Sequence, residues 1–170
     1  MKKNIVLTGF MGTGKTAVGR ELSRMLQMRL VDVDAEIEKD RQMSINEIFS
    51  GFGEQRFREI ETAMIRRLAG QRNLVISTGG GAVLREENME ALRENGMIFC
   101  LTADPETILS RTSGNDDRPL LKVEDPMARI RELLAFRMPF YEKAGVMIHT
   151  DGKTPLQVAE EIAEMFQCAK

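Results

Sequence analysis

The chain has 170 residues, of which 42% are hydrophobic and 29% charged, and its formal net charge is -2. This length and composition predict one globular domain with a sizeable core, and the charge excludes a basic field that would recruit nucleic acid or an anionic membrane. Neither a signal peptide nor an apolar stretch of the roughly 20 residues that span a bilayer is expected. The two cysteines, Cys100 and Cys168, do not suggest a disulfide framework, so we expect reduced thiols in a cytoplasmic protein.

A phosphate-binding motif follows the first predicted strand, at residues 4–8. The segment Gly9-Phe10-Met11-Gly12-Thr13-Gly14-Lys15-Thr16 fills every fixed position of the pattern G-x-x-x-x-G-K-[ST] and leads into a predicted helix at 15–27. Backbone N–H groups and the helix N-terminus favour an anion there, while Lys15 is expected to reach the β- and γ-phosphates and Thr16 to bind Mg²⁺. A glycine-rich turn without a ligand is the alternative, but the complete motif favours a nucleoside triphosphate.

Apolar runs of strand length alternate with helical patterns along the rest of the chain. The predicted strands after the first cover 29–33, 74–78, 96–102 and 145–149. The predicted helices after 15–27 cover 35–41, 44–50, 54–70, 86–95, 105–112, 126–143 and 155–168. This alternation predicts an α/β, three-layer P-loop NTPase fold, with a five-stranded parallel sheet flanked by helices. Asp104, Asp125 and Thr154 each precede a proline at a predicted helix start, where we expect them to act as N-caps.

Two carboxylates stand at the end of the second predicted strand, in Asp32-Val33-Asp34. Carboxyl ends of parallel strands gather at the edge that carries the P-loop. If the extended geometry continues to Asp34, both side chains point to the same side. One would then hold Mg²⁺, directly or through water, and the other would orient an acceptor hydroxyl or take its proton. The alternative is a solvated pair that caps the next helix, but the nearby P-loop favours the functional interpretation.

Three consecutive glycines, Gly79, Gly80 and Gly81, follow the strand predicted at 74–78. Glycine loses much conformational entropy on folding, so such a run marks close backbone approach or positive φ. A flexible turn is the simpler alternative. The place at the catalytic edge favours a backbone surface laid against a small ligand.

An irregular polar segment, Thr112-Ser113-Gly114-Asn115-Asp116-Asp117-Arg118-Pro119-Leu120-Leu121, lies between two predicted helices. It is either a surface loop or a lid that closes over the nucleotide and delivers Arg118. Phosphoryl transfer requires water to be excluded, which favours the lid.

Two further arginines, Arg58 and Arg137, lie beside apolar residues. A guanidinium can bind a carboxylate or a phosphate through two parallel hydrogen bonds. Arg58 also has Glu54 and Glu61 at helical spacing, so an ordinary surface salt bridge is the alternative for this residue. Taken together with Arg118, these arginines suit a second anionic ligand.

Several motifs are absent from the sequence. No aspartate is followed by glycine three residues later, and no asparagine is followed by lysine, so the signatures D-x-x-G and N-K-x-D of guanine-nucleotide switches are missing. No basic cluster suggests a nucleic-acid motor. Among the classes of P-loop protein considered, small kinases that phosphorylate small acceptor molecules remain.

The order of these motifs resembles the shikimate kinase family over nearly the whole chain. The segments that carry the resemblance are the P-loop, Asp32-Val33-Asp34, residues 53–61, Thr78-Gly79-Gly80-Gly81, Arg118-Pro119-Leu120-Leu121 and Arg137-Met138-Pro139-Phe140-Tyr141. The P-loop alone would indicate only a superfamily, whereas the arginines and the triple glycine are more specific. The resemblance implies a sheet of the nucleoside monophosphate kinase type. It also implies transfer of phosphate from ATP to the 3-hydroxyl of shikimate, in aromatic amino-acid biosynthesis.

The resemblance also assigns roles on the acceptor side. It implies that Arg58 and Arg137 bind the shikimate carboxylate. Asp34 would hydrogen-bond the ring hydroxyls and orient or deprotonate the 3-hydroxyl. The residues implied to surround the ring are Gly79, Gly80, Gly81, Phe49 and Phe57.

On the donor side, the resemblance implies that Lys15 and Arg118 stabilise charge on the transferring group. Thr16 would bind Mg²⁺, with Asp32 acting through water. Arg111 would stack near the adenine, with Pro155 on the nucleotide side and Lys153 where an arginine can occur. The implied nucleotide contacts of the loop are Gly12, Thr13, Gly14, Lys15, Thr16 and Ala17.

We therefore expect one kinase domain over 1–170, with a lid near 112–124 and an acceptor-binding helical segment near 33–61. A monomer that binds ATP and shikimate, and neither nucleic acid nor membrane, is expected. Another small P-loop kinase, such as a gluconate kinase, is the nearest alternative. The other is a regulatory protein that has lost catalysis; Lys15, Asp34 and Arg118 are all present, which argues against it.

Overall fold

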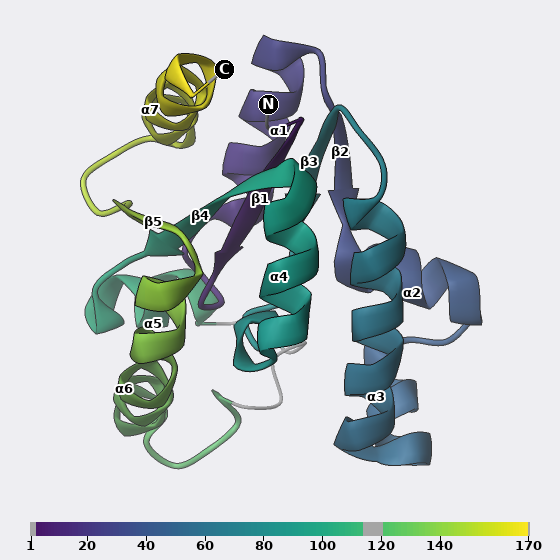
Figure 1. The fold of residues 1–170 in the computed structure, drawn as a ribbon. Helices are drawn as coiled ribbons and strands as arrows, with labels where there is room; N and C mark the ends of the chain where they lie inside the picture. The colour runs from purple at the N-terminus through teal and green to yellow at the C-terminus, as the bar shows by residue number, and fades with distance from the viewer. Residues whose placement is uncertain (1–2, 114–120, 170) are drawn as a thin grey trace.

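Five parallel strands form the centre of the fold, in the order β2-β3-β1-β4-β5 (Figure 1). They are β1 (Asn4–Gly9), β2 (Arg29–Asp32), β3 (Leu74–Ser77), β4 (Gly96–Thr102) and β5 (Val146–His149). The computed structural model describes residues 3–113 and 121–169. β1 and β3 are buried along their whole length, as expected of short apolar strands covered on both faces. The predicted strands are confirmed, each with ends shifted by at most one residue.

Helices cover both faces of the sheet and make three layers (Figure 1). They are α1 (Lys15–Leu26), α2 (Val33–Arg41), α3 (Ile45–Ala69), the short 3-10 helix η1 (Ala82–Leu84), α4 (Glu86–Asn95), α5 (Pro105–Thr112), α6 (Pro126–Ala144) and α7 (Pro155–Cys168). On one face, α1 and α7 pack Leu22 and Phe166 against Phe99 of β4. On the other, α3, α4 and α6 bury residues such as Ile65, Leu92 and Tyr141. The three-layer prediction is confirmed.

The segment predicted as two helices, 44–50 and 54–70, is interrupted at Gly53, where φ is 81° and ψ 168° and the backbone is not helical. The two helical parts that α3 joins across this kink confirm the predicted division. The helix begins at a capping box, in which the Ser44 hydroxyl accepts the N–H of Glu47 at 3.1 Å and the Glu47 carboxylate accepts the N–H of Ser44 at 2.7 Å. One glycine therefore interrupts the helical backbone and redirects the chain between the two parts of α3.

The helix caps agree with the sequence at two positions and differ at a third. Asp125 accepts the N–H of Ala128, and Thr154 accepts that of Gln157. Asp104 makes no cap with its own side chain. Instead, the Asp151 carboxylate, from the loop after β5, accepts the N–H of Asp104 at 2.8 Å and the hydroxyl of Thr107. A tertiary contact has replaced the local cap of α5.

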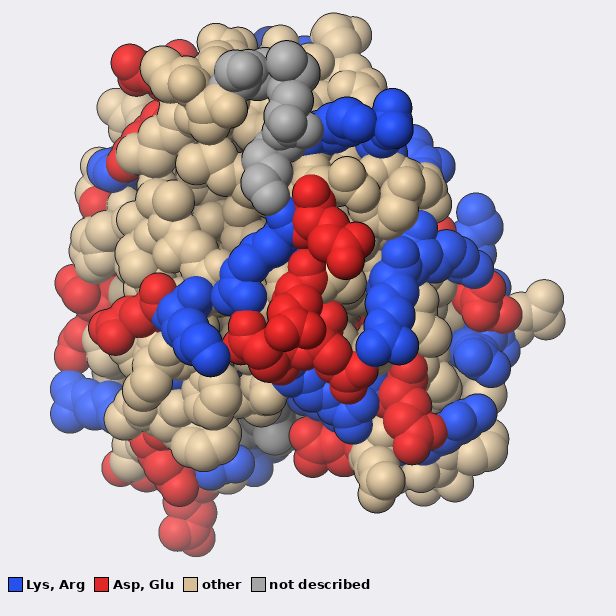
Figure 2. Space-filling model, viewed as in Figure 1, with Lys and Arg blue, Asp and Glu red and all other residues tan. Residues whose placement is uncertain are grey.

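Acidic and basic side chains lie side by side on the face that carries α4 (Figure 2). Glu86 pairs with Arg93 at 2.6 Å and with Lys143 at 3.3 Å, so α4 is linked to α6. Arg66 of α3 pairs with Glu87 at 2.8 Å. These exposed pairs contribute little to stability individually. Within residues 3–113 and 121–169, no helix is both long and apolar enough to cross a membrane.

Candidate functional site

The P-loop connects the end of β1 to the start of α1. Gly12 and Gly14 have φ values of 76° and 92°, which side chains other than glycine rarely adopt. Gly14 is the N-cap of α1 and supplies no side chain to the first helical turn. Backbone N–H groups of this turn are therefore available to an anion, and the helix dipole favours it.

Side chains of the loop hold it in this shape. The buried Thr13 hydroxyl donates to the carbonyl of Phe10 at 2.7 Å. Lys15 folds back, and its Nζ donates to the carbonyls of Gly9 at 2.8 Å and Phe10 at 3.0 Å. Thr16 and Ala17 are exposed at the start of α1. The residues predicted to contact phosphate thus lie together in the loop and the first turn of α1.

The residues predicted for the adenine side lie on α5 and after β5. Arg111 donates from Nη1 to the carbonyl of Gly12 at 3.1 Å and to the hydroxyl of Thr150 at 3.4 Å. The N–H of Lys153 donates to the carbonyl of Thr150, so this loop adjoins Arg111. Lys153 is exposed, and its Nζ pairs with Glu161 at 2.7 Å. Pro155 is exposed at the start of α7.

Arg118 lies outside the described residues, as do residues 114–120 of the expected lid. The helix before them, α5, ends at Thr112. The lid and the role of Arg118 stay predictions.

Asp32 and Asp34 differ from the predicted arrangement. β2 ends at Asp32 and α2 begins at Val33, so the extended geometry does not continue to Asp34. Asp32 is the N-cap of α2, and its Oδ1 accepts the N–H of Ala35 at 2.9 Å. The capping alternative therefore describes Asp32. Asp34 lies in the first turn of the helix, where its Oδ1 is shielded from solvent and finds no hydrogen-bond partner among the described residues.

The electrostatic surroundings of Asp34 are unusual. Burial raises the pKa of Asp34 to about 7, and the negative charges of Asp32 and Glu61 act in the same direction. The positive charge of Arg58 opposes them. A carboxyl group with a pKa near neutrality is suited to take a proton from a hydroxyl and to release it again.

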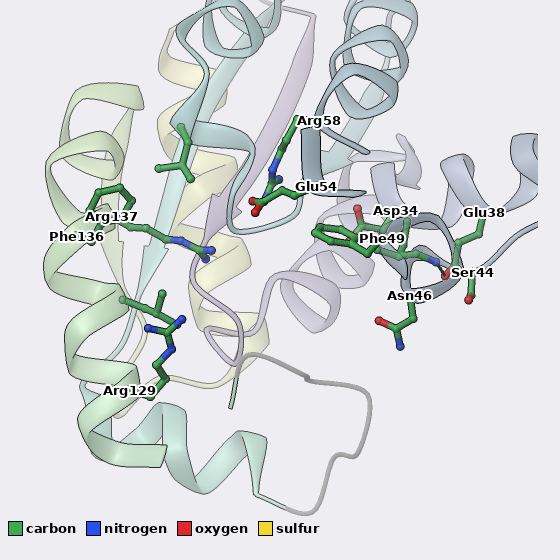
Figure 3. A pocket seen from close by; sticks show the side chains of 13 residues that line it. Asp34, Glu38, Ser44, Asn46, Phe49, Glu54, Arg58, Arg129, Phe136 and Arg137 are labelled. Carbon is green, nitrogen blue, oxygen red and sulfur yellow. Dashed lines mark hydrogen bonds and ion pairs between the residues drawn. The ribbon is translucent and has the colours of Figure 1, made fainter. Parts of the chain in front are cut away.

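A cavity of about 780 Å³ lies between α2 and α3 on one side and α6 on the other (Figure 3). Arg58 and Arg137 point into it from different helices, and Asp34 and Phe49 lie along the α2–α3 wall (Figure 3). The lining residues are Asp34, Glu38, Ser44, Ile45, Asn46, Phe49, Glu54, Arg58, Leu84, Arg129, Leu133, Phe136 and Arg137. Phe57 is not among them: it is buried in the core and stacks behind Phe49, with ring centroids 4.6 Å apart.

Arg58 forms the ion pairs that its helical spacing suggested. Its Nη1 lies 2.9 Å from Glu61, and its Nη2 lies 3.5 Å from Glu54. The first pair is no ordinary surface salt bridge, because the Glu61 side chain is only 1% exposed. Burial raises the pKa of Glu61 and the Arg58 charge opposes this effect. Sequence reasoning treated Glu61 only as a surface partner; its spacing from Arg58 was the available signal, but its burial was not.

Arg137 is buried on α6, with its Cζ 5.6 Å from the Phe10 ring centroid. Within residues 3–113 and 121–169, no carboxylate lies within ion-pair distance of it, although its positive charge acts on the buried Glu61. A buried cation without a directly bonded carboxylate is costly, so this position suits an anionic ligand.

The triple glycine brings these groups together. A Cβ on Gly81 would lie 2.4 Å from Nη2 of Arg58, and one on Gly80 would lie 3.1 Å from Nη1 of Arg137. The same Cβ on Gly80 would lie 3.2 Å from the carbonyl oxygen of Gly9 in the P-loop. A Cβ on Gly79 would lie 3.5 Å from carboxylate oxygens of both Asp34 and Glu61. The backbone of residues 79–81 therefore joins the cavity to the phosphate cradle.

The two residues predicted to hold Mg²⁺ keep oxygen atoms that could serve as ligands. Thr16 is exposed at the start of α1, and Asp32, at the end of β2, keeps one carboxylate oxygen beyond the one that caps α2. Such hard oxygen donors fit Mg²⁺. A second group, Asp104, His149 and Asp151, has ligand atoms within 4.8 Å of one another. There the Asp151 oxygens already accept bonds from α5, which indicates a structural cap.

Comparison with known proteins agrees with this geometry. A family model described as shikimate kinase matches residues 11–167. A shikimate kinase of Thermodesulfovibrio yellowstonii is 53% identical over 97% of this chain and 95% of its own length. One of Caldicellulosiruptor bescii is 50% identical, over 94% and 93% respectively.

Solved structures give the same result. The shikimate kinase of Acinetobacter baumannii, in complex with shikimate, superposes with a TM-score of 0.94 at 37% identity and covers 100% of this chain and 96% of its own. A gluconokinase of Sinorhizobium meliloti reaches a TM-score of only 0.66 at 17% identity, covering 98% and 95%, and so shares the fold alone. Together with the phosphate cradle and the adjoining cavity, these matches show that this chain belongs to the shikimate kinase family.

Proposed function

We propose that this chain transfers a phosphoryl group from ATP to the 3-hydroxyl of shikimate, giving ADP and shikimate 3-phosphate. The observation that carries the proposal is the place of Gly80, where an added Cβ would lie 3.2 Å from the carbonyl oxygen of Gly9 and 3.1 Å from Nη1 of Arg137. One backbone segment thereby adjoins the phosphate cradle and a cavity with two arginines. The shikimate complex of the Acinetobacter baumannii enzyme, similar over the whole chain, supports this choice of acceptor.

In the proposed complex, Arg58 and Arg137 bind the acceptor carboxylate. Arg137 supplies a buried positive charge without a carboxylate partner among the described residues. Arg58 is already oriented by Glu61, so little side-chain entropy is lost on binding. The ring would lie against Gly79–Gly81, with Phe49 as the apolar wall and Phe57 supporting it from behind.

Asp34 is the group proposed to orient the 3-hydroxyl and accept its proton. Its buried Oδ1 finds no hydrogen-bond donor among residues 3–113 and 121–169, and a substrate hydroxyl would supply one. Its pKa of about 7 suits exchange of a proton near neutrality.

The donor side holds ATP through backbone N–H groups of the P-loop. Lys15 would exchange its bonds with the carbonyls of Gly9 and Phe10 for the β- and γ-phosphates. Arg118 would add positive charge to the transferring group. The residues proposed near adenine are Arg111, Lys153 and Pro155.

Mg²⁺ is proposed to be held by Thr16, with Asp32 acting through water. When bound, it would neutralise charge on the phosphates. The donor chemistry of a hydroxyl and a free carboxylate oxygen supports this choice of ion.

We further propose a single domain over 1–170, with a lid near 112–124 and an acceptor-binding segment near 33–61. It would act as a monomer in the cytoplasm, without nucleic acid or membrane partners. Two free cysteines support a reducing compartment.

Coupled ADP release tests the proposal. Purified protein receives ATP and Mg²⁺ with shikimate, with gluconate, or with no acceptor. We expect ADP release only with shikimate. Turnover of gluconate alone would make the chain a different small kinase, and no turnover with either would favour a binding protein.

A further inference from the structure

Tyr141 places a buried hydroxyl between the triple glycine and Arg137. It lies on α6, one helical turn after Arg137, and its side chain is among the largest that are fully buried. The phenol donates to the carbonyl of Gly80 at 2.8 Å. A buried tyrosine hydroxyl requires such a partner, but this partner belongs to the segment that joins the two halves of the site.

The Arg137 guanidinium lies close to the same glycine. A Cβ on Gly80 would lie 3.1 Å from Nη1 of Arg137 and 3.4 Å from the Tyr141 oxygen, so both groups border the space beside Gly80. Burial raises the pKa of Tyr141 to about 12, and the nearby positive charge of Arg137 opposes this effect. The phenol therefore stays protonated near neutrality. Its proton goes to Gly80, which leaves the oxygen lone pairs available to a guanidinium donor.

Arg137 needs a positional restraint of this kind. Its long side chain would otherwise have several rotamers, and no carboxylate fixes it within residues 3–113 and 121–169. A carboxylate at that point would neutralise the charge that the acceptor must meet. A neutral hydroxyl orients the guanidinium and leaves its positive charge available.

We propose that Tyr141 is a positioning residue for acceptor binding, whose hydroxyl holds the Arg137 guanidinium against Gly80 in the orientation that receives the substrate carboxylate. The inference rests on the proposed function, because it takes that carboxylate as the ligand of Arg137. The aromatic ring of Tyr141 fills the core, and the positioning role belongs to the hydroxyl alone.

Tyr141→Phe separates the two roles, because it keeps the ring and removes the hydroxyl. We expect the KM for shikimate to rise about tenfold, while kcat and the KM for ATP stay within about twofold, as for loss of one hydrogen bond to a charged group. Thr62→Val is the matched control. It also removes a buried hydroxyl, but one without a hydrogen-bond partner among the described residues, so the KM for shikimate should not change.

A double-mutant cycle tests whether the hydroxyl acts through Arg137. In an Arg137→Ala background, Tyr141→Phe should change the KM for shikimate by less than about twofold, since the group it positions is gone. A tenfold rise in both backgrounds would overturn the inference. So would an unchanged KM in the single variant, provided that the unaltered enzyme turns over shikimate. Failure of the unaltered enzyme to use shikimate would instead remove the proposed function.

The unaltered protein offers a second measurement, which does not depend on a variant that folds. Tyr141 is the only tyrosine, and the chain has no tryptophan. Intrinsic tyrosine fluorescence therefore comes from this phenol alone. Saturating shikimate should change its emission, and gluconate at the same concentration should not. Shikimate binding, detected by calorimetry, without any change in emission would contradict the inference.

Discussion

The donor and acceptor halves of the site are built in different ways. The phosphate-binding part of the donor half is one contiguous segment, residues 9–17, which ends at the start of helix α1. The acceptor half is assembled from four separate segments. Its groups are Asp34, Arg58, Gly79–Gly81 and Arg137, and the charged ones are largely removed from water.

This difference determines how substitutions should affect binding in each half. Backbone donors survive most side-chain changes nearby, and Lys15 already has partners within its own loop. A buried charge in the acceptor half has few substitutes, because removing it leaves its neighbour unpaired. Single substitutions in the acceptor half should therefore change shikimate kinetics and leave ATP binding nearly intact.

Asp34→Asn should give the largest effect. The amide cannot take the hydroxyl proton, so kcat should fall by about 10²- to 10⁴-fold, the range of general base catalysis. The Kd for ATP, measured by calorimetry, should stay within about twofold. Glu38→Gln is the control: Glu38 lies one turn further along α2 and lines the same cavity, but it is exposed. An unchanged kcat for Asp34→Asn would remove Asp34 from the mechanism.

Arg137→Ala should give the second-largest effect. Loss of a buried cation that binds a carboxylate should raise the KM for shikimate on the order of 10²-fold, as expected for a buried charge pair. The KM for ATP should change little. Arg129→Ala is the control on the same helix, since Arg129 lines the cavity but already pairs with Glu132 at 2.9 Å. Equal losses for both substrates would indicate that Arg137 is structural.

Gly81→Ala tests the backbone contact of the acceptor half. The added methyl would overlap the Arg58 guanidinium, so Arg58 must move, and the KM for shikimate should rise about tenfold, as for loss of one charged hydrogen bond. Gly51→Ala, on α3, places its methyl in open space and should leave both KM values unchanged. A normal KM for Gly81→Ala would mean that the resting position of Arg58 is unrelated to binding.

The same contrast explains what could be predicted from the sequence. The P-loop is local in the chain, and its motif determines both its conformation and its ligand. Apolar runs and proline-marked helix starts predicted the sheet and the helices to within a few residues. The division of residues 44–70 into two helices is confirmed by the non-helical backbone at Gly53, where φ is 81°.

The acceptor half could be predicted only through a family resemblance, because its geometry depends on tertiary contacts. Asp34 was expected just beyond a strand, beside Asp32 if the extended geometry continued, and it lies in the first turn of the helix that Asp32 caps. Phe57 was expected against the ligand and lies in the core behind Phe49. The burial of Glu61 and the contact of Tyr141 with Gly80 arise from segments far apart in sequence.

The smallest effect is expected at the edge of the donor half, for Lys153→Met. Lys153 is exposed and paired with Glu161, and an exposed pair contributes at most about 1 kcal/mol, so the KM for ATP should rise no more than about fivefold. Arg111→Met is the informative comparison, because Arg111 contacts the P-loop carbonyl of Gly12, and its loss should weaken ATP binding more. Neither change should alter the KM for shikimate. A larger effect of Lys153→Met than of Arg111→Met would mean that the loop after β5, and not α5, provides the main adenine contact. A change in shikimate KM with either variant would show that the two halves are coupled by more than the closeness of Gly80 to the P-loop carbonyl of Gly9.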